Sequence, residues 1–132
     1  MILAVNRRIA PGLDTTAPKT SSIGIVTVLL EGGADPNLAD ENGKTALHYA
    51  AAFGKDEAVQ ILIEHGASID LQDNNGNTAL HSAATNGKTK VVSALIELGA
   101  ALELQNEEGQ TPLDVAKNEA IIELLNEAGA GN

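Results

Sequence analysis

The chain has 132 residues, enough for one domain with a modest core, and it contains no cysteine, which excludes disulfides, a thiol nucleophile and a thiolate metal site. Tyr49 and Phe53 are its only aromatic residues, so the core must be aliphatic, which suits thin layers of short helices better than a sandwich or barrel. The net charge of −10 falls entirely on residues 40–132, where five lysines face fifteen acidic residues, and such a surface repels a nucleic-acid backbone.

The acidic surface favours a partner with a basic patch, although an acidic surface also serves solubility alone. Residues 1–5 are apolar but too short for a signal-peptide core, and the charges of Arg7 and Arg8 lie on the wrong side of them. No stretch approaches the roughly 20 apolar residues of a membrane helix. We therefore expect a soluble intracellular protein, cytoplasmic or nuclear, that binds neither membrane nor nucleic acid.

Residues 1–22 are irregular, because Pro11, Gly12 and Pro18 interrupt them. We expect a degenerate first helix or a loose capping arm there. In residues 23–39, an aliphatic stripe ends at Gly33, and a similar stripe ends one period later at Gly66. This spacing predicts the second half of a degenerate first unit.

Residues 40–72 and 73–105 are near copies of each other. The run Asp40-Glu-Asn-Gly-Lys-Thr-Ala-Leu-His returns in the second copy as Asp73-Asn-Asn-Gly-Asn-Thr-Ala-Leu-His. A fixed period of this length predicts stacked units that share a core with their neighbours. Within the first copy we expect a turn, a helix over about 46–53 and a second helix over about 56–64.

Threonine and glycine mark the beginnings and ends of these helices. A threonine suits the N-cap of each first helix, and these residues are Thr45, Thr78 and Thr111. One glycine of each unit lies in the turn, where positive φ is needed, and two more end the helices. In chain order the glycines are Gly43, Gly54 and Gly66, with their copies Gly76, Gly87 and Gly99.

Residues 106–130 form a third, shortened unit. Its first helix opens at Pro112, where the missing N–H costs little. Thr45 to Val59 spans fourteen residues, whereas Thr111 to Ile121 spans ten, so the connection between the helices has lost four residues. Glutamates alternate with the aliphatic residues of the second helix. We interpret this unit as a polar C-terminal cap.

The turn with its glycine, the Thr-Ala/Pro-Leu-His-x-Ala-Ala run and the Gly-Ala ending are similar to the ankyrin repeat over about residues 23–130. The resemblance implies an all-α solenoid of stacked helix-turn-helix units joined by finger loops with β-turns. It departs from the family pattern in residues 1–22 and at Asp114, where the family has histidine.

The candidate catalytic and metal-binding groups do not converge. Units stacked about 10 Å apart would hold His48 and His81 too far from each other to share a zinc ion. The resemblance implies that these imidazoles instead hydrogen-bond around the turns of Thr45 and Thr78. Carboxylates such as Asp40 belong to turns or loop tips, whereas acid–base catalysis needs a desolvated site. We expect no enzyme activity, metal or cofactor.

The resemblance places Asn37 at the loop position that asparaginyl hydroxylases modify in animal members of the family, which makes it a candidate hydroxylation site. The alternative, which we favour, is a loop asparagine that bonds its own backbone.

The resemblance also implies that a partner binds the concave face made by the turn tips and the first helices. The contact residues predicted there are Glu41, Asn42, Lys44, Tyr49, Ala52, Phe53, Gln72, Asn74, Asn75, Asn77, Thr85, Asn86, Gln105, Glu107, Glu108 and Gln110. Phe53 is either an exposed anchor, as aromatic residues at interfaces often are, or packs onto the neighbouring unit. For Tyr49 we expect packing between units, with the hydroxyl reaching the groove.

The sequence thus predicts a protein-interaction module or adaptor that acts as a monomer or weak homodimer. One alternative is a regulatory or targeting part of a longer enzyme or signalling protein, a setting in which ankyrin units often occur. Another is a designed stack without a natural partner, against which the unequal unit lengths and the irregular stretch over 1–22 argue.

Overall fold

A computed structural model describes residues 31–129. The chain divides into two compact units, Met1–Ala34 and Asp35–Asn132, and the second is described here by itself. The degenerate first helix or capping arm expected in residues 1–22 and the aliphatic stripe of residues 23–30 lie outside the described residues.

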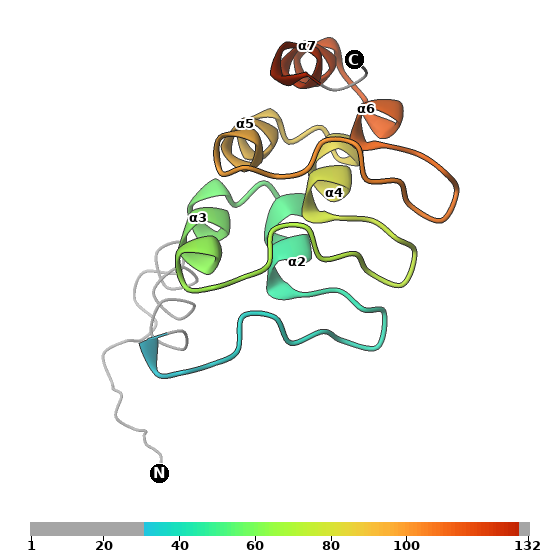
Figure 1. Cartoon of the computed structure of the whole chain (residues 1–132). Helices are drawn as coiled ribbons and strands as arrows, with labels where there is room; N and C mark the ends of the chain where they lie inside the picture. The colour runs from blue at the N-terminus through green and yellow to red at the C-terminus, as the bar shows by residue number, and fades with distance from the viewer. Residues whose placement is uncertain (1–30, 130–132) are drawn as a thin grey trace. The chain divides into compact units, whose positions relative to one another are not determined.

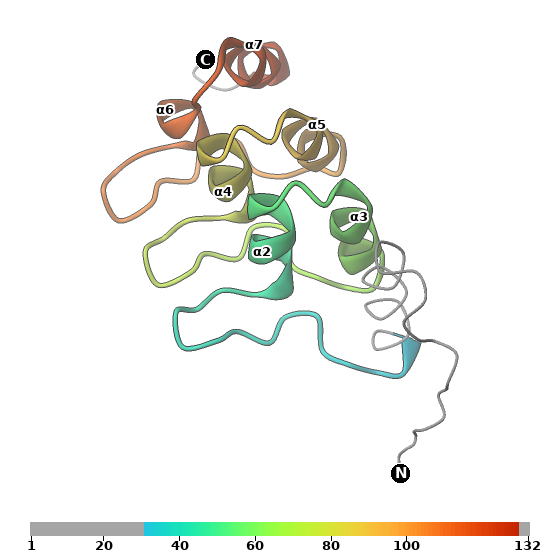
Figure 2. The same ribbon diagram turned by 180° about the vertical axis from the view of Figure 1, so that it is seen from behind.

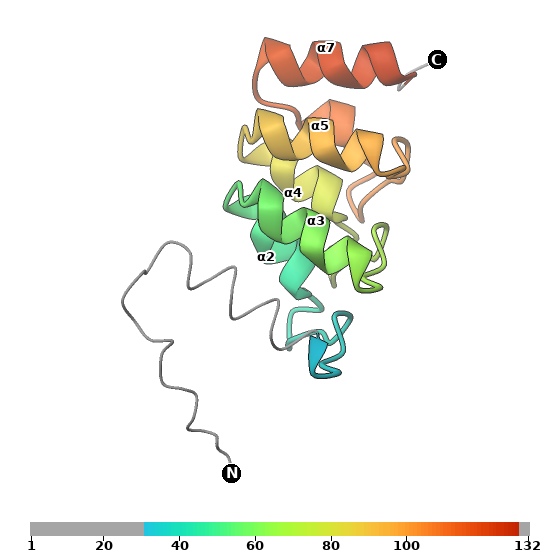
Figure 3. The ribbon, with the colours of Figure 1, turned by 90° about the vertical axis from the view of Figure 1, so that its left-hand side faces the viewer.

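Three helix pairs make up the described part of the second unit. They are α2 (Ala46–Ala52) with α3 (Asp56–Glu64), α4 (Ala79–Thr85) with α5 (Thr89–Glu97), and α6 (Pro112–Val115) with α7 (Glu119–Ala128). The first helices α2, α4 and α6 form one layer, and α3, α5 and α7 form the other (Figures 1 and 2). Figure 3 shows the second layer stacked in chain order. The all-α fold is confirmed, since residues 31–129 contain helices and no strand.

Capping boxes begin all three first helices. Thr45 pairs with His48, Thr78 with His81 and Thr111 with Asp114, each residue satisfying a backbone N–H of the other. A helix of seven residues is marginal in water on its own, so these caps and the packing between units must stabilise it together.

The core is aliphatic and runs through all three pairs. Ala50, Ala51, Ala83 and Ala84 are buried in α2 and α4 and let these helices approach each other closely. The second helices contribute larger residues, and the fully buried ones are Val59, Val91, Val92, Leu95, Ile121 and Leu125. Ile63 and Ile96, at corresponding positions of α3 and α5, are only half-buried.

The shortened third unit differs from the others in its first helix. Helix α6 has four residues and ends at Ala116, which adopts an extended conformation with φ −63° and ψ 138°. Asn118 then caps α7 by accepting a hydrogen bond from the N–H of Ile121 at 2.9 Å. The expected loss of four residues from the connection is therefore wrong: three residues join the helices of each pair (53–55, 86–88 and 116–118), and the shortening falls on α6, which has four residues where α2 and α4 have seven. Helix α7 keeps a full length of ten residues.

The finger loops repeat one turn and press against each other. In each turn an Asp or Asn side chain accepts two backbone N–H groups, and these residues are Asp40, Asp73 and Asn106. The N–H of Asn74 bonds the carbonyl of Asn42 at 3.0 Å, and the N–H of Glu107 bonds that of Asn75 at 2.9 Å. Consecutive fingers are thus joined backbone to backbone.

The contact between the fingers can be tested with Gly76→Ala and its matched control Gly109→Ala. Both glycines have φ near +80°, but a Cβ on Gly76 would lie 2.8 Å from the Cα of Asn106, whereas one on Gly109 would meet no atom within 4 Å. The shared backbone strain should cost about 1–2 kcal/mol of unfolding free energy in both variants. Overpacking should add about 1–3 kcal/mol in Gly76→Ala.

Urea denaturation followed by far-UV circular dichroism measures the difference. Equal losses in the two variants would contradict the close approach of the second and third fingers.

Candidate functional site

The two buried histidines connect successive units. The backbone N–H of Thr45 donates to Nδ1 of His48 at 3.0 Å, so the proton of this neutral imidazole lies on Nε2, which bonds the carbonyl of Asn77 at 2.9 Å. His81 repeats the arrangement, with Nδ1 at 3.1 Å from the N–H of Thr78 and Nε2 at 2.8 Å from the carbonyl of Gln110. Both nitrogens of each imidazole are therefore occupied. Each ring fixes its own turn and also the finger of the next unit.

Several of the polar residues predicted to contact a partner also hold the fingers together. The side-chain amide of Asn74 donates to the carbonyl of Glu41 at 2.9 Å, and that of Gln72 donates to the carbonyl of Gln105 at 3.0 Å. The amide of Asn106 donates to Oδ1 of Asn77 at 3.0 Å. Contact of these residues with a partner stays a prediction. Their bonds between fingers were missed because they depend on the register between units, although the spacing of Gln72 and Gln105 by one full period was a signal.

Asn37 does more than bond its own loop, and the interpretation favoured from the sequence is corrected here. Its backbone N–H does bond the carboxylate of Asp35, at 2.8 Å. The side chain, however, donates to the carbonyl of Gly66 at 3.1 Å and accepts from the N–H of Ser68 at 2.7 Å. The corresponding Asp70 accepts from Ala101 at 2.9 Å. Asn37 therefore ties its loop to the next unit, and its hydroxylation stays a prediction.

Tyr49 does not pack between units as expected. Its side chain is exposed, and its hydroxyl donates a hydrogen bond to the carboxylate of Asp40 in the same unit. This bond, with further help from the N–H of Lys44, lowers the pKa of Asp40, and it raises the pKa of Tyr49. The ammonium of Lys44 lies 5.8 Å from the centre of the tyrosine ring, within cation–π range. Tyr49 is thus held beside the first finger.

Phe53 is the most exposed aromatic residue, with 65% of its surface accessible. Its N–H bonds the carbonyl of Tyr49 at 3.0 Å, a helical i to i+4 contact that places both aromatic side chains on one side of α2. The corresponding positions of the next unit carry Ser82 and Asn86, whose amide bonds the carbonyl of Ser82 at 2.8 Å. The first full unit therefore carries exposed aromatic residues at these two positions, whereas the second carries polar ones.

The remaining predicted contact residues are distributed over the finger loops and the ends of the first helices. Those that are exposed are Glu41, Asn42, Asn75, Thr85, Asn86, Gln105, Glu107 and Glu108, and those that are half-buried are Lys44, Ala52 and Gln110. The fingers all lie on the side of α2, α4 and α6 (Figure 1). That the predicted residues form one contact face stays a prediction.

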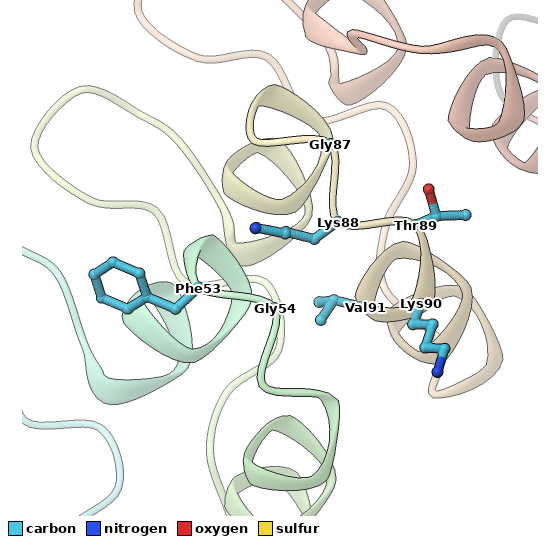
Figure 4. Close-up of a pocket in the computed structure, with 7 residues that line it drawn as sticks. All are labelled: Phe53, Gly54, Gly87, Lys88, Thr89, Lys90 and Val91. Carbon is cyan, nitrogen blue, oxygen red and sulfur yellow. The ribbon is translucent and has the colours of Figure 1, made fainter.

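Two hollows on the surface of the described residues lie beside predicted contact residues. The first, which we term the Phe53 hollow, has a volume of about 340 Å³ and is lined by residues 53–54 and 87–91 (Figure 4). The second, of about 380 Å³, lies between the last two fingers and the shortened α6, with Thr85, Glu108 and Lys117 in its wall. Within residues 31–129 no group of three or more potential ligands could hold a metal ion.

A family model described as "Ankyrin repeats (3 copies)" matches residues 16–106 and 66–131, and together these matches cover most of the chain. The chain belongs to the ankyrin repeat family. A search of curated proteins gave no match. Ankyrin repeats generally mediate protein–protein interaction, and domains built from them are typically not catalytic. None of the helices described for this ankyrin domain has the length and apolar character needed to cross a membrane.

The burial of His81 predicts that the domain loses stability in acid. Burial lowers the pKa of His81 from its ordinary value of 6.5, although the bond to Gln110 and the charge of Asp73 act in the opposite direction. The unfolded chain therefore takes up this proton more readily than the folded one. His81 should contribute full stability above about pH 6.5 and lose it as pH falls through the lower pKa of the folded state.

Melting temperatures between pH 7.5 and pH 5 test this expectation. The decrease in melting temperature from pH 7.5 to pH 5 should be smaller in His81→Gln than in the unaltered chain. The decrease should be unchanged in His65→Gln, which removes an exposed imidazole and leaves the His81 bonds in place. An unchanged slope in His81→Gln would contradict the assignment.

Proposed function

We propose that this ankyrin domain is an adaptor that binds a partner protein on the face formed by the finger loops and the first helices α2, α4 and α6. The observation that carries the proposal is the exposure of Phe53, at 65%, on the same side of α2 as Tyr49. Large aromatic side chains are enriched among the residues that dominate binding energy at interfaces. Both of the aromatic residues that this protein contains lie on this face.

The rigidity of the face supports the same function. The fingers are joined by backbone and side-chain bonds, and the imidazoles of His48 and His81 fix them to the first helices. A surface ordered before binding loses less conformational entropy on association. The finger loops therefore present fixed groups to a partner at little entropic cost.

The charge of the finger tips favours a basic patch on the partner. Glu41, Glu107 and Glu108 are exposed at the tips of the first and third fingers, and the domain as a whole is acidic. Complementary charge accelerates association and fixes orientation more than it adds affinity. We propose an intracellular partner protein and neither nucleic acid nor a membrane, with the domain acting as a monomer or weak homodimer.

A second possible function is that of a regulatory or targeting domain within a longer protein, with a partner bound on the same face. The domain would then regulate or target a longer enzyme or signalling protein whose chemistry lies in other residues. Two full units of equal length followed by a shortened one suit a module with a defined C-terminal cap in either setting.

Affinity capture from the native cell lysate, followed by measurement of the captured partner, tests the proposal with Phe53→Ala. Because Phe53 is mostly exposed, its truncation should leave the melting temperature nearly unchanged. It should weaken the complex by about 1–2 kcal/mol or more if the ring is an anchor.

The control is Leu98→Ala, which removes an apolar side chain of 39% exposure at the end of α5, in the other helix layer. Equal binding by the two variants would argue against the proposed face. A large fall in melting temperature with unchanged binding in Phe53→Ala would assign the ring to packing instead.

A further inference from the structure

The Phe53 hollow differs in charge from the rest of the acidic domain. Its lining includes two of the five lysines of residues 40–132, Lys88 and Lys90, and no carboxylate. Asp56 and Glu57 begin α3 nearby in the chain, but they do not line the hollow. An exposed phenyl ring and a local positive charge therefore occur together on a domain whose net charge is negative.

Lys88 is held in place by its aliphatic stem. A Cβ built on Gly54 would lie 3.0 Å from Cδ of Lys88 and 3.5 Å from its Cε, so the stem runs closely across the Gly54 backbone. Lys88 is half-buried, whereas Lys90 is exposed. Long cationic side chains commonly bury the stem and keep the charge in water. The ammonium of Lys88 is consequently presented from a partly fixed position.

The two lysines point in different directions. Figure 4 shows the Lys88 side chain extending toward the side on which Phe53 lies, while Lys90 extends away from Phe53, beyond Val91. Only one of the two charges is thus available to a ligand that also covers the phenyl ring. Lys90 provides a control of the same charge, close to Lys88 in the chain and on the far side of the hollow.

We infer that the Phe53 hollow binds a peptide segment of the partner that carries a large apolar side chain and, within one to three residues of it, a carboxylate. The apolar side chain covers Phe53 and the carboxylate pairs with Lys88. This inference rests on the proposed function, since it names the chemistry of the partner at the hollow beside the end of α2, which adjoins the proposed face and extends to the start of α5. Phe53 supplies the apolar contact and Lys88 determines the preference for acid.

Charge complementarity selects this occupant. A basic segment would meet the Lys88 ammonium without any carboxylate in the lining to offset it, and like charges placed together at an interface are strongly unfavourable. A free anion would use Lys88 but leave Phe53 uncovered. At physiological ionic strength a Debye length of about 8 Å screens the carboxylates of more distant exposed residues. The charged side chains that a bound segment meets in the lining are therefore positive, although the net charge of the domain is negative.

The opposite charges of the hollow and the finger tips would also fix the direction of the partner. Exposed glutamates at the tips favour basic groups, whereas Lys88 favours an acidic one. A segment with both signs can lie along the face in only one favourable register. Specificity then arises from the order of charges rather than from their number.

A library of random twelve-residue peptides displayed on phage, selected on the immobilised full chain, tests the inference. The enriched peptides should carry an aromatic or large aliphatic residue with Asp or Glu one to three positions away. Selection on Lys88→Gln should lose the acid preference and keep the apolar one, and selection on Lys88→Arg should retain both. Lys90→Gln should select the same peptides as the unaltered chain, and Phe53→Ala should lose the apolar preference.

One enriched peptide and its twin, with Asp or Glu replaced by Asn or Gln, are then compared by fluorescence polarisation. The Kd of the twin should be about tenfold weaker on the unaltered chain. The two Kd values should converge on Lys88→Gln. Circular dichroism melting of each variant establishes that it is folded.

The outcomes separate this inference from the function on which it rests. Peptides that depend on Phe53 but show no acid preference, or a basic one, would overturn the inference and leave the binding face intact. Acidic peptides that bind independently of Phe53, or that respond to Lys90→Gln as strongly as to Lys88→Gln, would also overturn it. Failure of the selection to enrich any peptide would contradict the hollow as a peptide-binding site. Capture of a partner that binds Phe53→Ala as tightly as the unaltered chain would instead contradict the proposed face.

Discussion

The hydrogen bond from a histidine of one unit to a backbone carbonyl of the next is the interaction on which this domain depends. His48 and His81 bond the carbonyls of Asn77 and Gln110, each 29 residues further along the chain. First helices of seven residues cannot persist alone, and finger loops without internal helices have little core of their own. One buried imidazole therefore joins three otherwise weak elements: a helix start, its own turn and the following finger.

The third unit shows how the same interaction ends. Asp114 replaces the histidine and still completes the capping box, since its carboxylate accepts from the N–H of Thr111 at 2.9 Å. An ionised carboxylate has no proton to donate, so it cannot satisfy a carbonyl of a further unit as His81 does. The replacement of histidine by Asp114 therefore keeps the capping box but removes the side-chain donor that links one unit to the next. It occurs in the unit whose first helix, α6, is shortened.

Sequence periodicity predicted the elements well because each depends on local chemistry. Capping threonines, turn glycines and the aliphatic stripes located both helices of the first copy within about a residue: α3 spans the expected 56–64, and α2 ends at Ala52 rather than Phe53. The expected start of α6 at Pro112 is also confirmed. The contacts between units were harder to predict. Asn37 bonds Gly66 and Ser68 of the following unit, because the register between units is set by stacking geometry that no single unit contains. The bond from Tyr49 to Asp40 lies within one unit and depends instead on the direction that the tyrosine side chain takes.

The side-chain bonds between fingers change which residues we expect to determine the specificity for a partner. Finger residues such as Gln72, Asn74 and Asn77 already use their amides to hold the fingers together, so a partner that competed for those groups would weaken the platform it binds. The side chains of Phe53 and Lys88 are placed differently: the ring is mostly exposed and the ammonium extends beyond its packed stem. Groups that can be desolvated without breaking internal bonds contribute most to net affinity. If the proposed function holds, we therefore expect the ends of the first helices and the loops beside them to distinguish one partner from another better than the finger tips do.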